Sequence, residues 1–135
     1  MILEPGLTSK DYEDVVSKGV WLAKAGFGAV SKATEYVELV SEAREAGLFT
    51  TLHTGGASIP GSFPITGEDL IDINPHVSFH INGGPVSMED KYFEVVARDT
   101  EIAMQVCTAG NLRTAILCAE MAKKHSAFDR FLIAT

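Results

Sequence analysis

Three ionisable residues stand at comparable places in three successive apolar segments of the chain. Lys24 lies near the end of VWLAKA, His53 closes LFTTLH, and His80 lies near the end of HVSFHI. The interior of a parallel sheet favours apolar side chains, so polar groups at equal depth in consecutive strands indicate chemistry rather than packing. Neutral imidazole is the commonest metal ligand in proteins. The pattern therefore predicts a functional site at these three positions, with His53 and His80 as candidate metal ligands.

Each of these residue types also has an interpretation without a metal. A single histidine at a strand end is more often a core residue bonded to the backbone, but two histidines one repeat apart, each followed by paired glycines, favour a site. A lysine ammonium repels a metal and commonly binds substrate or pairs with a carboxylate, so spacing leaves the role of Lys24 open. His76 begins its segment and His125 ends a helical one, and both are expected to be structural.

Glycine-rich turns follow both histidines and supply the expected substrate contacts. Paired glycines let the backbone leave a strand sharply and approach a ligand, although ordinary loops use them as well. Cys107 lies at the end of another apolar segment, where a small buried side chain is the commoner interpretation and a pocket wall the alternative. The residues expected near substrate are Thr54, Gly55, Gly56, Asn82, Gly83 and Cys107.

Short apolar runs alternate with segments of helical periodicity along the chain. Strands are expected at residues 20–25, 48–53, 76–81, 102–108 and 130–135, so that successive strands begin 28, 28, 26 and 28 residues apart. Helices are expected at residues 9–18, 32–46, 66–73, 87–98 and 111–125. Helical crossovers make the strands parallel, and right-handed crossovers keep the helices on one side of a curling sheet.

This order predicts an α/β fold in a single incomplete domain over residues 1–135. The expected architecture is a partial (β/α)8 TIM-type barrel with about five parallel strands and intervening helices. Ligands then collect at the carboxyl ends of the strands, where the lysine and the two histidines are expected. A doubly wound open sheet would give the same alternation, but Gly26-Phe27-Gly28 lacks the third glycine of a dinucleotide-binding turn.

Length and charge narrow the possible partners. The 135 residues are enough for one domain with its own core. A net charge of -7 without a basic run argues against nucleic acid and against an anionic membrane surface. The sequence shows no signal-peptide pattern and no apolar run near the roughly 20 residues of a membrane span, and two widely spaced cysteines indicate a reducing compartment. We therefore expect a cytoplasmic protein that binds a small molecule.

The segments LHTGGASIPGS and SFHINGGP resemble the amidohydrolase superfamily, and the resemblance covers essentially all of the chain. In that superfamily a (β/α)8 barrel holds one or two divalent metals, zinc or iron. The ligands are a His-x-His pair on strand one, a carboxylated lysine or a glutamate on strand four, histidines on strands five and six and an aspartate on strand eight. The resemblance places Lys24, His53 and His80 on strands four, five and six, and it implies a carboxylated Lys24.

The resemblance also implies hydrolysis of a carbon–nitrogen bond by a metal-activated hydroxide, with a cyclic amide as the expected substrate. Residues 1–4 would correspond to strand three and residues 130–135 to strand eight. The His-x-His pair and the aspartate are then missing, and the isolated chain is expected to be inactive. Five strands cannot close such a barrel, and the exposed apolar face and sheet edges predict a homo-oligomer.

Two alternatives stay open from the sequence. The first is a catalytically silent, oligomeric half-barrel in which the lysine and the histidines surround water or a stray ion. The second is an anion-binding barrel fragment in which the glycine N–H groups bind phosphate and Lys24 supplies the opposite charge.

Overall fold

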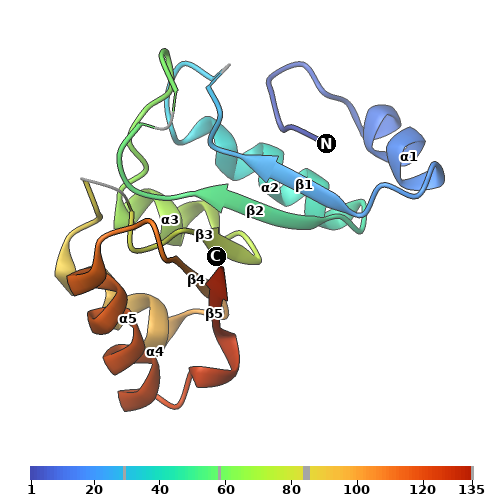
Figure 1. Ribbon diagram of the computed structural model, residues 1–135. Helices are drawn as coiled ribbons and strands as arrows, with labels where there is room; N and C mark the ends of the chain where they lie inside the picture. The colour runs from blue at the N-terminus through green and yellow to red at the C-terminus, as the bar shows by residue number, and fades with distance from the viewer. Residues whose placement is uncertain (29, 58, 84–85, 135) are drawn as a thin grey trace.

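The computed structural model describes residues 1–28, 30–57, 59–83 and 86–134, and these form an open parallel sheet with helices packed along it (Figure 1). The strands are β1 (Leu22–Ala25), β2 (Phe49–His53), β3 (Val77–Phe79), β4 (Ala103–Cys107) and β5 (Phe131–Ala134). They pair in chain order and all in parallel. Such an arc of a TIM-type barrel confirms the predicted fold class.

Over the described residues, five helices alternate with the strands. They are α1 (Ser9–Ser17), α2 (Glu35–Glu45), α3 (Gly67–Ile73), α4 (Asp90–Asp99) and α5 (Leu112–Lys124), and a short 3-10 helix, η1 (Phe128–Arg130), precedes β5. Consecutive helices from α2 to α5 contact one another, so they form a continuous layer. Among the described residues, none of the helices combines the length and the apolar character that crossing a bilayer would require.

Some predicted boundaries are corrected by the structure. The strand expected over residues 76–81 ends at Phe79, because His80 has a φ of 39° and leaves the extended conformation. The helices expected from residues 32 and 87 begin three residues later, at Glu35 and Asp90. Residue 135, the last of the final expected strand, lies outside the described residues.

Strand register separates two faces of the sheet. Ala25 aligns with Leu52, and both are fully buried beneath the helices. Lys24 aligns with Thr51, and Thr51 aligns with Val77, so these three side chains belong to the opposite face. The face turned away from the helix layer therefore carries the lysine of the candidate site.

The first residues of the chain extend the sheet beyond β1. Ile2 forms a parallel bridge with Lys24, the Leu3 N–H donates to the Lys24 carbonyl at 2.9 Å, and the Lys24 N–H donates to the Met1 carbonyl at 2.9 Å. Leu3 is buried in the core. Residues 1–4 therefore lie where a strand preceding β1 would lie, as the resemblance implied.

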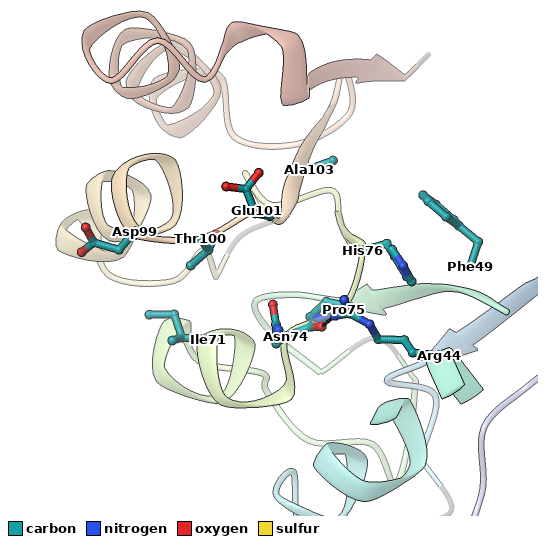
Figure 2. Close-up of a pocket in the computed structure, with 10 residues that line it drawn as sticks. All are labelled: Arg44, Phe49, Ile71, Asn74, Pro75, His76, Asp99, Thr100, Glu101 and Ala103. Atoms are coloured by element: carbon teal, nitrogen blue, oxygen red, sulfur yellow. Dashed lines mark hydrogen bonds between the residues drawn. The ribbon is translucent and has the colours of Figure 1, made fainter. Parts of the chain in front are cut away.

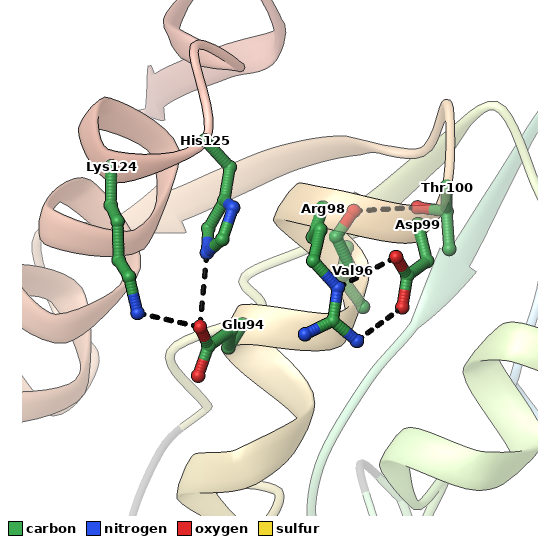
Figure 3. Close-up of polar contacts among 7 residues, drawn as sticks. All are labelled: Glu94, Val96, Arg98, Asp99, Thr100, Lys124 and His125. Atoms are coloured by element: carbon green, nitrogen blue, oxygen red, sulfur yellow. Dashed lines mark hydrogen bonds and ion pairs between the residues drawn. The ribbon is translucent and has the colours of Figure 1, made fainter.

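Polar contacts join α4 to α5 on the outer surface. The Glu94 carboxylate accepts from Lys124 Nζ at 2.6 Å and contacts His125 Nε2 at 3.1 Å (Figure 3). Exposed ion pairs add little to stability, so the burial of Phe93 and Cys118 between the helices and the sheet dominates this packing. His125 has the structural environment expected of a helix end.

Candidate metal centre

The two histidines of the predicted site meet at the carboxyl ends of β2 and β3. His53 Nδ1 lies 3.4 Å from His80 Nε2, and the ring centroids are 4.7 Å apart. His53 aligns with Phe79, so a regular strand would direct the next residue to the opposite face. The positive φ of His80 breaks this alternation. The backbone turn therefore brings His80 to the same side as His53.

The turn at His80 is held by β4. Gln105 Oε1 accepts from the His80 N–H at 3.3 Å, and the Gln105 carbonyl accepts from the Ile81 N–H at 2.8 Å. Gln105 is not among the residues that the sequence predicts at the site. The signal that could have found it is a polar residue at an inward position of AMQVC, an otherwise apolar strand.

Lys24 carries a buried amine at the same end of the sheet. Its side chain is 9% exposed, and Nζ has no hydrogen-bond partner among the described residues. Nζ lies 4.6 Å from the ring centroid of Phe79 and 5.2 Å from that of Phe27. Burial disfavours the ammonium form and lowers the pKa of Lys24 to about 7. The amine is therefore available in its neutral form near neutral pH.

Both histidines are neutral in the same range. Burial is the main cause that lowers the pKa of His80 to about 4, and the nearby His53 and Lys24 lower it further. Burial also lowers the pKa of His53, against the hydrogen bond to the Gly56 carbonyl, which acts in the opposite direction. Metal ligation requires neutral imidazole, so the electrostatics of the site suit a metal.

The donor set fits a divalent metal such as zinc. Two zinc–nitrogen bonds of about 2.0–2.1 Å at a tetrahedral angle separate their nitrogens by about 3.3–3.4 Å. The observed separation of His53 Nδ1 and His80 Nε2 is 3.4 Å. Among the described residues, histidines, cysteines and carboxylates form no group of three or more that could hold a metal. The histidine pair therefore needs Lys24, or groups beyond these residue types, to complete a coordination shell.

The loop after β2 holds three of the residues expected near substrate. Thr54 is fully buried, and its Oγ1 lies 2.7 Å from Ser78 Oγ. The Gly55 N–H donates to the Ile65 carbonyl at 2.9 Å. His53 Nε2 bonds to the Gly56 carbonyl. The loop is thus fixed against its neighbours directly beside His53, and substrate contact by these residues stays a prediction.

The loop after β3 braces the next strand. Asn82 is fully buried, its Nδ2 donates to the Cys107 carbonyl at 3.0 Å, and its Oδ1 accepts from the Cys107 N–H at 2.9 Å. The Asn82 amide is therefore bonded to the backbone of β4, whereas Cys107 is half-buried at the end of that strand. Substrate contact by Asn82, Gly83 and Cys107 also stays a prediction.

In the part of the glycine turns that the structure describes, the N–H groups of three glycines are already bonded. Gly55 donates to Ile65, Gly56 donates to the Val86 carbonyl at 2.9 Å, and Gly83 donates to the His80 carbonyl at 2.6 Å. A phosphate would have to displace these bonds to be held by the turns. The arrangement therefore argues against the anion-binding alternative.

A cavity of about 630 Å³ opens at the other end of the strands, lined among others by Arg44, Phe49 and His76 (Figure 2). His76 Nδ1 accepts from the Thr50 N–H at 3.0 Å, and the ring stacks on Phe49 with centroids 4.7 Å apart. His76 therefore fastens the beginning of β3 to β2, the structural role expected of it, away from the other two histidines.

Comparisons with known proteins point to one superfamily. No family model matches the chain. Over 133 residues, 98% of this chain, the sequence is 33% identical to enamidase from Eubacterium barkeri, of which it covers 34%. The crystal structure of enamidase, described as a new member of the amidohydrolase superfamily, matches all of the chain with a TM-score of 0.89 and 32% identity, and the chain covers 35% of it. The chain spans about a third of the length of these relatives, and over that segment it is similar to enamidase, a protein described as a member of the amidohydrolase superfamily.

Proposed function

We propose that this chain is a segment of a metal-dependent hydrolase, in which Lys24, His53 and His80 contribute ligands to a divalent metal. The observation that carries the proposal is the 3.4 Å separation of His53 Nδ1 and His80 Nε2, together with the buried Lys24 amine, which has no hydrogen-bond partner in the described part of the chain. The similarity to enamidase supports an amide bond as the target.

The metal and the side chains of this chain would have different roles in the reaction. A bound zinc or iron would lower the pKa of water and polarise a substrate carbonyl. Neutral His53 and His80 would keep lone pairs available for the metal. The neutral amine of Lys24 can attack the carbon of carbon dioxide, which forms an N–C bond, releases one proton and leaves an anionic carbamate. We propose this carbamate as the form in which Lys24 joins the site, because its ammonium form would repel the metal.

A cyclic amide is the substrate class that we propose. Hydrolysis would add water across the carbon–nitrogen bond and open the ring to a carboxylate and an amine. Phe27, which is 40% exposed, and the half-buried Phe79 flank Lys24 and offer apolar surface to such a ring. Full activity would need groups beyond the three proposed ligands, and we expect the chain alone to be inactive.

Metal content of the purified chain tests the site. After exposure to Zn²⁺ and gel filtration, inductively coupled plasma mass spectrometry should find close to stoichiometric zinc in the natural chain. His53→Ala and His80→Ala should each lose it, whereas His125→Ala should retain it, because His125 contacts Glu94 on the outer surface. Equal zinc in all variants, or zinc in none of them, would refute the site.

Carboxylation of Lys24 has its own measurement. Carbon-13 NMR of the zinc-loaded chain equilibrated with labelled bicarbonate should show a slowly exchanging carbamate signal. Lys24→Arg should abolish the signal, and Lys18→Arg, which changes an exposed lysine of the surface, should preserve it. A spectrum without the signal, or one that Lys24→Arg leaves unchanged, would mean that Lys24 acts without the modification.

A further inference from the structure

A backbone carbonyl determines which nitrogen of His53 carries its proton. His53 Nε2 bonds to the Gly56 carbonyl oxygen. A carbonyl only accepts, so the neutral His53 ring carries its proton on Nε2 and presents a lone pair on Nδ1. That lone pair faces His80 Nε2 at 3.4 Å.

The turn that carries this carbonyl is tied to the following loop. The Gly56 N–H donates to the Val86 carbonyl at 2.9 Å, and Gly55 exchanges backbone hydrogen bonds of 2.9 and 2.8 Å with Ile65. A Cβ on Gly55 would lie 2.8 Å from the Val86 carbonyl oxygen, at a φ of +99° that side chains rarely adopt. A side chain at position 55 would therefore push the turn away from its anchor.

The residue that follows β1, Gly26, packs against His53. A Cβ on Gly26 would lie 2.7 Å from His53 Cβ and 3.0 Å from its backbone nitrogen. Gly26 thus packs against the backbone of His53, and the Gly56 carbonyl holds its ring at Nε2.

We propose that Gly26, Gly55 and Gly56 form a backbone cradle that locks His53 in the Nε2–H tautomer, so that Nδ1 is the nitrogen available to a metal. The inference rests on the proposed metal site. Gly26 and Gly55 are then positioning residues that act through His53.

Nitrogen-15 NMR of the histidine-labelled chain tests the cradle, with spectra recorded above pH 7, with and without zinc. Long-range proton–nitrogen correlations distinguish the two tautomers, and single substitutions assign the four histidines. His53 should carry its proton on Nε2 in both states. A proton on His53 Nδ1 in either state would overturn the proposal.

The metal-free spectrum separates this inference from the proposed function. A chain that takes up no zinc would refute the metal site. The tautomer of His53 without metal would still decide whether the cradle exists, because that prediction requires no ligand.

Gly55→Ala and Gly61→Ala form a matched pair for the turn. Both positions have similar positive φ values, +99° and +87°, but a Cβ on Gly61 meets nothing within 4 Å. Gly55→Ala should give His53 a mixture of tautomers and weaken zinc binding about 10–100-fold, whereas Gly61→Ala should change neither. A folded Gly55→Ala chain with an unchanged His53 tautomer would contradict the proposal.

Gly56→Ala gives a second test if Gly55→Ala does not fold. Its added Cβ would lie 3.1 Å from the Val86 side chain and would displace the turn less. We expect a smaller population of the second His53 tautomer, and an entirely unchanged tautomer would again count against the cradle.

Discussion

The buried amine of Lys24 destabilises the folded chain, and the same residue is a candidate metal ligand. Its pKa is lowered to about 7 from 10.5 by burial, so above pH 7 the unfolded chain binds more protons than the folded one. Wild-type stability should therefore rise between about pH 7 and 10.5 through this group. Lys24→Met should stabilise the metal-free chain by roughly 1–3 kcal/mol near pH 7, and the gain should shrink with rising pH.

Urea denaturation of the Lys24→Met and natural chains over this pH range measures the difference, and Lys18→Met controls for the loss of a charge. Comparing the two chains cancels the opposite alkaline effects of other groups, such as Cys118, whose pKa burial raises to about 12. A stabilisation that grew with pH would contradict the burial of an unpartnered Lys24 amine.

Three histidines should make the metal-free chain sensitive to acid. The pKa values of His53, His76 and His80 are all lowered mainly by burial, that of His80 from 6.5 to about 4. Below about pH 6.5 the unfolded chain binds more protons, so stability should fall as the pH drops towards about 4. Between about pH 6.5 and 4, the free energy of unfolding of His80→Gln should fall by roughly 2 kcal/mol less than that of the natural chain, as measured by thermal or urea denaturation. An equally steep loss in this variant would show that His80 titrates normally.

The sequence predicts the convergence of Lys24, His53 and His80, because parallel strands place their carboxyl ends at one edge of a sheet. It does not predict Gln105 or Gly26. Their contributions depend on the positive φ of His80 and on a close approach between two backbones, and neither follows from residue type or spacing.

Strand and helix periodicity predicts the order and type of the principal elements, but not every boundary. The strand β3 is shorter than its apolar pattern because His80 turns out of the sheet. The helix α4 begins after Glu89, which serves as its N-cap, rather than near residue 87. Local capping geometry and side-chain contacts between strands determine where such elements begin and end. The pattern of apolar residues does not predict these positions.

Asn82 should be essential to the link between β3 and β4. Asn82→Ala would leave the buried N–H and carbonyl of Cys107 without their side-chain partner, and we expect a loss of about 2–4 kcal/mol by urea denaturation. Asn111→Ala, which removes an N-cap acceptor of α5, should cost only about 1 kcal/mol. Equal losses in the two variants would contradict a bracing role for Asn82.

The open sheet leaves apolar residues without cover. Ile133 is 70% exposed and Leu132 is 41% exposed on β5, while Phe49 is 40% exposed on β2. We expect a homo-oligomer in which copies of the chain cover these surfaces. Ile133→Lys should weaken association in sedimentation velocity, and Ile59→Lys, in the loop after β2, should not. A natural chain that sediments as a monomer at high concentration would contradict this expectation.

Zinc K-edge X-ray absorption of the zinc-loaded chain examines whether His53 and His80 bind the metal together. We predict a nitrogen and oxygen shell at about 2.0–2.1 Å with outer-shell scattering from two imidazoles, and scattering from fewer imidazoles in any zinc that His53→Ala or His80→Ala retains. A shell of oxygen atoms alone, or identical spectra for the natural chain and both variants, would contradict a metal centre built on these two histidines.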